Sequence, residues 1–154
     1  MIQSFSKFKP SALLKPTQDT PFHIDYEWWE RQDRDLRVYL RTHLCDEHRE
    51  LFETHQDTED IDWIDEDTGQ VTSVDGLQHI LRIHCSLQPG YVDARTPLVD
   101  AIFRVFLANS NKPLTPAELS ARVKRPPSMI LKVLAGHRVH MGLRPYIENT
   151  GDAA

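Results

Sequence analysis

The sequence predicts a mainly α protein with small β-hairpins, in which a helix-hairpin-helix region precedes a second helical unit. Three observations support this fold class. Apolar residues recur at intervals of three, four and seven along much of the chain, which is typical of amphipathic helices. Two short segments, 61–74 and 139–147, place turn residues between β-forming runs and so predict hairpins. Prolines at the start of apolar runs in the C-terminal third mark helix beginnings.

Composition bounds the class of protein. The chain has 154 residues, 40% of them hydrophobic, which is enough to bury a core. Its net charge of -5 is unevenly distributed along the chain. Residues 1–90 hold 9 Lys and Arg and 18 Asp and Glu, whereas residues 91–154 hold 9 Lys and Arg and 5 Asp and Glu. A basic C-terminal part favours contact with nucleic acid. No run of apolar residues could span a membrane and no secretory leader is visible, so we expect a cytoplasmic protein that does not contact a membrane.

The N-terminal region begins with a predicted extended arm over residues 1–20, where prolines forbid a long helix. An acidic helical region with a hairpin is predicted over 21–90. Asp25 is expected to cap the longest helix of the chain, which runs to Phe52. Apolar residues at intervals of four and seven define one face of this helix: Trp29, Leu36, Leu40, Leu44, His48 and Phe52. The charged side chains on the opposite face, Arg34 and Asp35 among them, are interpreted as a solvated surface with ion pairs.

A charged hairpin is predicted next. Segment 61–65 faces segment 70–74, and Gly69 supplies the positive φ of the turn. The acids of this segment lack the spacing of a calcium loop, so we interpret them as an edge that resists pairing with other sheets. A short helix is expected from Leu77 to His84, before the break at Pro89.

The C-terminal region, 91–154, is predicted to hold three short helices and a ribbon. Thr96 is expected to cap the first helix with its hydroxyl, and Thr115 with Glu118 forms a capping box for the second. Pro127 starts the third helix and Gly136 is placed to end it. A two-stranded ribbon is then expected around Gly142, with Val139 and Met141 on one strand and Leu143 and Ile147 on the other.

This order of helix, helix-turn-helix and ribbon resembles the winged-helix branch of helix-turn-helix proteins, over about residues 96–148. The residues that carry the resemblance are 114–123, the turn 124–126 and 127–134. Within them, Leu119, Val123, Ile130 and Leu134 match the positions that hold the two helices together. The turn departs from the family pattern, because Lys124 replaces the usual glycine, Arg125 the usual apolar residue and Pro126 the usual serine or threonine cap.

The resemblance implies a regulator of transcription that binds double-stranded DNA, with its third helix in the major groove. The residues then expected to contact DNA are Arg122, Lys124, Arg125, Ser128, Leu131, Lys132, Arg138, His140 and Arg144. Because winged helices also bind proteins, the alternative is a non-enzymatic adaptor that captures a protein partner, and the apolar Leu131 and Pro127 on the outward face are consistent with it.

Cysteine and histidine residues offer a second site. Cys45 and His48 form a Cys-x-x-His pair, and His84 adjoins Cys85, so the sequence contains the four ligands that a Cys2His2 zinc site requires. Adjacent side chains on a helix diverge by about 100° and share an ion poorly unless the helix ends between them. We therefore expect core histidines, small buried cysteines and no cofactor. A metal-responsive regulator is the weaker alternative.

No catalytic site is predicted. The sequence has no glycine-rich phosphate loop, no nucleophile elbow and no His-Glu-x-x-His, so we expect a protein that is not an enzyme. A homodimer is expected, because Phe5, Phe8, Trp28 and Trp29 together with a long amphipathic helix exceed what a small core needs.

Overall fold

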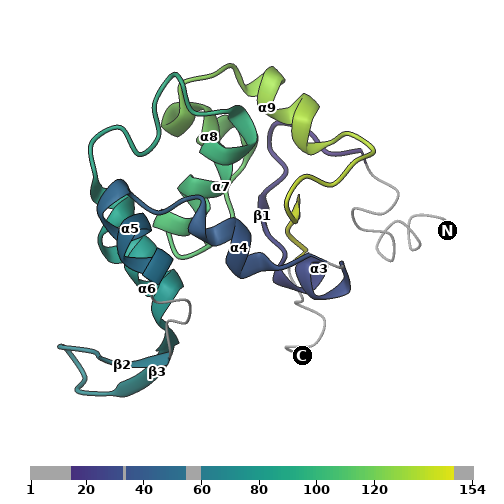
Figure 1. Ribbon diagram of the computed structural model, residues 1–154. Coiled ribbons are helices and arrows are strands. Elements are labelled where there is room, and N and C mark those ends of the chain that lie inside the picture. The colour runs from purple at the N-terminus through teal and green to yellow at the C-terminus, as the bar shows by residue number, and fades with distance from the viewer. Residues whose placement is uncertain (1–14, 33, 55–59, 148–154) are drawn as a thin grey trace, which may run out of the picture.

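The computed structural model describes residues 15–32, 34–54 and 60–147, and this part of the chain is mainly helical (Figure 1). The predicted class is therefore confirmed at that level. The helices are α3 (Tyr26–Arg31), α4 (Leu36–Arg41), α5 (Asp46–Thr54), α6 (Gly76–Ile83), the 3-10 turn η1 (Cys85–Leu87), α7 (Leu98–Ala108), α8 (Pro116–Val123) and α9 (Pro127–Leu134). Two antiparallel pairs make the described sheets, β1 (Phe22–Ile24) with β4 (Leu143–Pro145), and β2 (Asp60–Ile64) with β3 (Val71–Asp75).

The prediction of one long helix after Asp25 is wrong, because the segment forms α3, α4 and α5. Asp25 caps α3, as expected, through its carboxylate and the Glu27 N–H. Asp35 then caps α4 by accepting the Arg37 N–H, with extended backbone at φ -90° and ψ 109°. An aspartate that accepts the amide two residues ahead begins a new helix and does not continue the previous one. The apolar repeat survives the breaks, because it lies along successive short helices.

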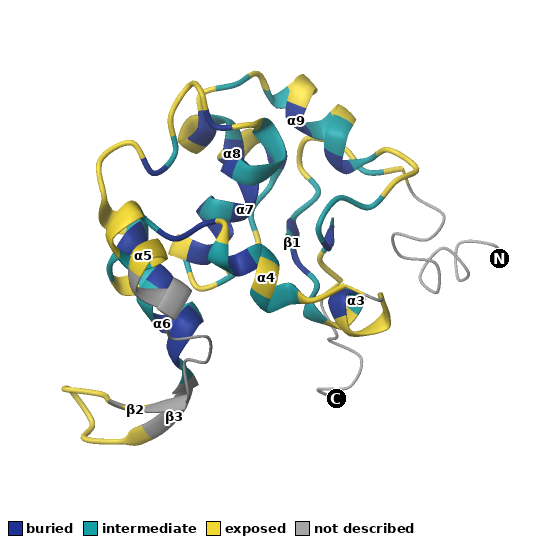
Figure 2. Cartoon of the chain, in the orientation of Figure 1, coloured by how far each residue is buried: buried dark blue, intermediate teal, exposed yellow. Residues whose placement is uncertain are grey.

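The predicted hairpin is confirmed. Ile61 pairs with Val74 and Ile64 with Val71, and Gly69 adopts φ +74° in the turn. The hairpin projects from one end of the molecule, where the described residues between the strands are exposed (Figures 1 and 2). Asp75 ends β3 and caps α6 through the Leu77 N–H.

The helix starts in the C-terminal region agree with the local signals in all but one detail. Thr115 accepts the Glu118 N–H and Glu118 accepts the Thr115 N–H, which confirms the capping box, and α9 begins at Pro127. Thr96 does not cap α7, because its hydroxyl bonds Asp93 instead. The helix α9 ends at Leu134, two residues before Gly136.

The predicted ribbon around Gly142 is wrong. The strand β4 pairs with β1, with Phe22 opposite Pro145 and Ile24 opposite Leu143. Phe22 also bridges Leu114, in the link between α7 and α8. The cause is Trp29, whose indole lies so near Gly142 that a Cβ there would approach Nε1 to 2.8 Å. The chain therefore turns around this indole, with positive φ at Met141 and Gly142, and does not fold into a local hairpin.

One cluster of buried residues unites the two predicted regions. Phe22, Trp29 and Leu81 from the first pack in the same core as Phe103 and Phe106 from the second. The helix α7 supplies the densest run of buried side chains (Figure 2). Trp29, one of the four aromatic residues used to predict a dimer, is thus part of the core. Phe5 and Phe8, in the predicted arm, lie outside the described residues, and the homodimer stays a prediction. In the described ranges, every helix is too short or too polar to cross a membrane.

Candidate nucleic-acid interface and candidate metal centre

The helices α8 and α9 pack through the four positions that the resemblance singled out. Leu119, Val123 and Ile130 are almost fully buried, and Leu134 is 7% exposed. The turn between the helices keeps the conformation that glycine favours, because Lys124 adopts the left-handed region at φ 59°. The Ser120 hydroxyl donates to the Arg125 carbonyl oxygen at 2.6 Å and closes the turn. The two helices are therefore fixed relative to each other, with the Lys124 side chain exposed.

Four of the predicted DNA-contacting residues are exposed cations on or next to α8 and α9, and we call them the cationic face: Arg122, Lys124, Lys132 and Arg138. None of these four side chains makes an ion pair with a residue that the structure describes. Ser128 is exposed on α9 beside them. The acid Glu118 lies in the same segment, and its carboxylate is held in the capping box of α8. The face therefore carries uncompensated positive charge.

Other predicted contacts have structural partners. The Arg125 Nη2 donates to the carbonyl oxygens of Thr96 at 2.6 Å and Ala94 at 3.0 Å, which directs this guanidinium into the loop before α7. Arg144 pairs with Asp25 at 3.2 Å. Leu131 and His140 are half-buried. Of the nine predicted residues, five are therefore exposed and four are half-buried: Arg125, Leu131, His140 and Arg144.

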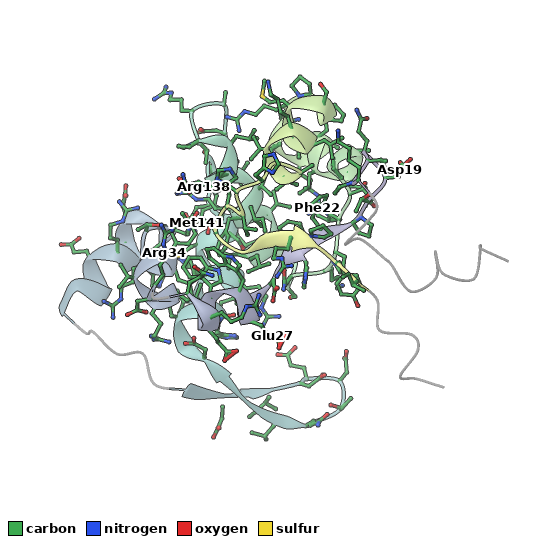
Figure 3. The ribbon with its side chains drawn as sticks, turned by 90° about the vertical axis from the view of Figure 1, so that its right-hand side faces the viewer. Asp19, Phe22, Glu27, Arg34, Arg138 and Met141 are labelled. Carbon is green, nitrogen blue, oxygen red and sulfur yellow. The ribbon has the colours of Figure 1, made fainter. Side chains whose placement is uncertain are left out.

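One residue was missed by the sequence argument. Arg34 lies in the link between α3 and α4, where its Nη1 is 4.0 Å from the Met141 sulphur. A cleft of about 320 Å³ lies there, between Arg34, Arg138 and Met141 (Figure 3), and none of its described lining residues is acidic: Trp28, Gln32, Arg34, Arg138, Val139, His140 and Met141. We call it the Arg34 cleft. It forms because residues 138–141 turn around Trp29, which no local sequence signal predicts.

The structure brings Cys45, His48, His84 and Cys85 together in what we call the Cys2His2 cluster. One ligand atom from each lies within 4.8 Å of all the others. The Cys45 sulphur is 3.3 Å from His48 Nδ1, 3.6 Å from His84 Nδ1 and 3.4 Å from the Cys85 sulphur. Of the described Cys, His, Asp and Glu residues, these four form the candidate metal site.

Helix ends explain the convergence. Cys45 immediately precedes α5, and His48 lies in its first turn. The helix α6 ends at Ile83, and His84 leaves helical geometry at φ -124° and ψ -61° before Cys85 opens η1. The divergence expected of adjacent helical side chains therefore does not apply. The interpretation of His48 and His84 as core histidines is wrong, because both are half-buried.

The fully enclosed histidine is His43, which adds no ligand to the cluster. It stacks on Phe103 and accepts a hydrogen bond at Nδ1 from Arg104 Nε at 3.0 Å. Burial, reinforced by the Arg104 charge, lowers the pKa of His43 to about 4. His43 is therefore neutral at physiological pH and belongs to the core.

Charge around the cluster suits a cation. Glu47 Oε2 lies 3.5 Å from His84 Nε2, the nitrogen that faces away from the sulphurs. Burial raises the pKa of the Cys85 thiol to about 12, although the Cys45 backbone N–H bonds its sulphur and acts in the opposite direction. A buried thiol of this kind becomes a thiolate when a metal ion supplies the compensating charge.

No protein-family model matches this chain, and no curated protein or solved structure is found to be similar to it. The resemblance to winged helices in sequence order is therefore not reinforced by these comparisons.

Proposed function

We propose that this protein binds double-stranded DNA and regulates transcription, with α7, α8 and α9 acting as a helix-turn-helix unit beside the β1–β4 pair, which stands where the predicted ribbon was expected. The observation that carries the proposal is the cationic face, whose four Lys and Arg side chains have no acidic partner among the described residues. Exposed cations without partners release counterions from a phosphate backbone on binding. The packing of α8 on α9 is complete without these side chains, so they are available to a ligand.

The helix α9 offers the groups suited to base edges. Lys132 and Ser128 are exposed on it, and Lys132 can donate to the O6 and N7 acceptors of guanine in the major groove. Arg122 and Lys124 flank α9 from the preceding helix and turn, and we assign them to phosphates. The division predicts that Lys132 sets sequence preference, whereas Arg122 and Lys124 set affinity.

The Arg34 cleft supports a second phosphate contact. Its lining joins Arg34 and Arg138 with His140 and an indole (Figure 3), and no described lining residue is an acid that would repel phosphate. Since Arg138 belongs to both surfaces, the cleft extends the cationic face toward α3 and α4. We assign this cleft to the DNA backbone.

Charge segregation also favours this orientation. The described acids of the hairpin, Asp62, Asp65, Glu66 and Asp67, are exposed. The strands β2 and β3 project from the end of the molecule that lies away from α9 (Figure 1). A duplex on α9 would therefore lie far from the strongest negative charge, which limits the repulsion expected from the acidic region.

The test is a binding titration of the full chain against genomic DNA fragments over a series of salt concentrations. We expect Lys132→Ala to weaken the preferred fragment by about 1–3 kcal/mol and to relax discrimination. Arg122→Ala should weaken all fragments alike and reduce the salt slope by about 1. The matched control is Arg82→Ala, which removes one positive charge from α6, a helix that lies away from α9 (Figure 1). Equal losses in all three variants, or no binding at low salt by a folded protein, would favour the adaptor.

A further inference from the structure

We propose that Cys45, His48, His84 and Cys85 bind one zinc ion in a closed, four-ligand structural site. Nothing in the proposed DNA-binding function requires this ion, so the inference stands on the cluster alone. The ligand atoms are the two sulphurs and the Nδ1 atoms of the two histidines.

The distances match tetrahedral coordination. Zinc bonds of about 2.3 Å to sulphur and about 2.0–2.1 Å to nitrogen place two sulphurs about 3.8 Å apart and a sulphur and a nitrogen about 3.6 Å apart. The Cys45 sulphur is 3.4 Å from the Cys85 sulphur. Sulphur–nitrogen distances are 3.3 Å and 3.6 Å from Cys45, and 3.8 Å from Cys85 to His48. These four distances lie within a few tenths of an ångström of the tetrahedral values. Since all four ligand atoms lie within 4.8 Å of one another, side-chain shifts of at most about 1.5 Å let one ion contact all of them.

The donor set selects the metal. Two thiolates and two imidazoles in a tetrahedral arrangement are typical of structural zinc. The Cys45 sulphur contacts both histidine nitrogens, so the sulphur and nitrogen ligands surround a single point. A two-iron cluster that holds cysteines on one iron and histidines on the other would separate them. Four protein ligands also leave no open position for substrate, which makes the site structural.

Residues around the ligands orient them for an ion. The Glu47 carboxylate, 3.5 Å from His84 Nε2, favours the tautomer whose proton is on Nε2 and whose lone pair at Nδ1 faces the sulphurs. This contact matches the hydrogen bond that a carboxylate usually makes to a zinc-bound histidine.

The position of the ligands in the chain indicates what a metal would stabilise. Cys45 and His48 precede the excursion formed by most of α5, β2 and β3, and His84 and Cys85 follow it after α6. A link between the two ends of such a segment restricts the conformations of the unfolded chain, which is how disulfides and metals stabilise small units. A zinc ion would close the excursion at its base, beside the buried Cys85.

Metal analysis of the purified full chain, without a histidine tag, tests the stoichiometry. We expect one zinc per chain after gel filtration. Replacement by Co(II) then tests the ligands, because four-coordinate cobalt gives strong visible absorption and a cobalt–thiolate bond adds a charge-transfer band in the ultraviolet. Both signals are expected from the unmodified protein, so this test does not depend on whether a ligand variant folds.

Substitutions distinguish the residues that bind the ion from the residue that orients one of these ligands. Cys45→Ser is expected to remove part of the charge-transfer band and to release zinc to a weak chelator. Glu47→Gln should weaken zinc affinity about 10–100-fold while the cobalt spectrum keeps its shape, because the residue orients a ligand without contacting the ion. His137→Gln, on an exposed residue outside the cluster, is the matched control and should change neither reading.

Three outcomes would overturn the proposal. The first is metal-free protein whose circular dichroism is the same with and without added zinc. The second is a Cys45–Cys85 disulfide in freshly purified protein, detected as a mass lower by two hydrogens. The third is a cobalt complex without thiolate charge transfer, which would assign the metal to other residues.

Discussion

The unit formed by α7, α8 and α9 and the segment from Cys45 to Cys85 show two ways of holding short helices. In the first, apolar side chains such as Phe103, Phe106 and Leu119 are fully buried. In the second, the four residues of the Cys2His2 cluster lie at the two ends of the segment, and the chain returns to the core at α6. The difference teaches that the helical unit is held chiefly by buried apolar contacts, whereas the acidic segment has a proposed metal site at its base.

Removal of the metal should produce the largest effect and would break this comparison most directly. Apparent zinc-binding free energies are about 10–16 kcal/mol in zinc-finger peptides, where binding is part of folding. We expect chelation to remove amide-exchange protection from α5, the hairpin and α6, and to reduce it less in α7, α8 and α9. Hydrogen exchange followed by mass spectrometry measures each segment. An equal loss of protection in all helices would show that the metal stabilises both regions alike. If no segment lost protection, the metal would not contribute to the stability of the fold.

A pair of arginine variants should give the next largest effect. Arg125→Ala removes two hydrogen bonds to the Ala94 and Thr96 carbonyl oxygens, one of them at 2.6 Å. Bonds from charged groups to partly buried carbonyls are worth about 1–3 kcal/mol, so we expect a loss of that order in the free energy of unfolding. Arg122→Ala, on an exposed residue, should leave stability within about 0.5 kcal/mol. Denaturant titration compares the two, and equal effects would contradict the structural role of Arg125.

Local signals predicted helix starts and turns well, and contacts between distant segments poorly. The Thr115 capping box and the Gly69 turn depend on hydrogen bonds and backbone angles within a few residues, which the sequence contains. The pairing of β4 with β1 depends on where the Trp29 indole packs, which is a tertiary contact. The long-helix prediction failed although a signal was present, because Asp35 was assigned to a charged face and is in fact a cap.

The candidate sites divide in the same way. The ligand types of the Cys2His2 cluster were identified from the sequence, but their convergence depends on α6 ending at Ile83. The sequence equally placed Arg125 among the DNA contacts, because it cannot show that the Thr96 carbonyl accepts from its guanidinium. Arg34 was missed because its cleft is formed by residues 138–141, which are remote in sequence. The sequence gives the type of each side chain directly, whereas its exposure to solvent and its hydrogen-bond partners depend on residues that are distant in the sequence.

The turn between α8 and α9 offers a variant that separates binding from folding. Lys124 holds φ 59°, a conformation that costs an L-residue about 1 kcal/mol relative to glycine. Lys124→Gly is therefore expected to leave stability unchanged or to raise it by up to about 1 kcal/mol, while it removes one charge from the cationic face. Affinity for DNA should fall on every sequence alike. Thermal unfolding and binding titration give the two results, and Lys124→Gln is the control that removes the charge alone. Unchanged affinity in both variants would exclude Lys124 from the interface.

The smallest effect is expected at the seam between β1 and β4, which seals the helical unit. His23 lies in β1 and is half-buried, with Asp25, Arg144 and the Tyr146 ring as neighbours. Burial, opposed by Asp25 and reinforced by Arg144, lowers the pKa of His23 below its ordinary value of 6.5. The unfolded chain therefore binds a proton more readily than the folded one. The stability that the neutral side chain contributes is complete above pH 6.5 and is lost as the pH falls from there toward the folded pKa.

A variant isolates this contribution from the acid sensitivity of the metal ligands. Acid also protonates thiolates and imidazoles, so the metal site weakens over the same range and the raw pH profile mixes the two regions. The difference in unfolding free energy between wild type and His23→Gln cancels the metal contribution, because both proteins carry the same Cys2His2 cluster. We expect this difference to change by less than about 1 kcal/mol across pH 6.5, with wild type losing stability relative to the variant on the acid side. A difference that is constant with pH would show that the seam does not sense protonation, and would leave the cluster as the acid-sensitive element.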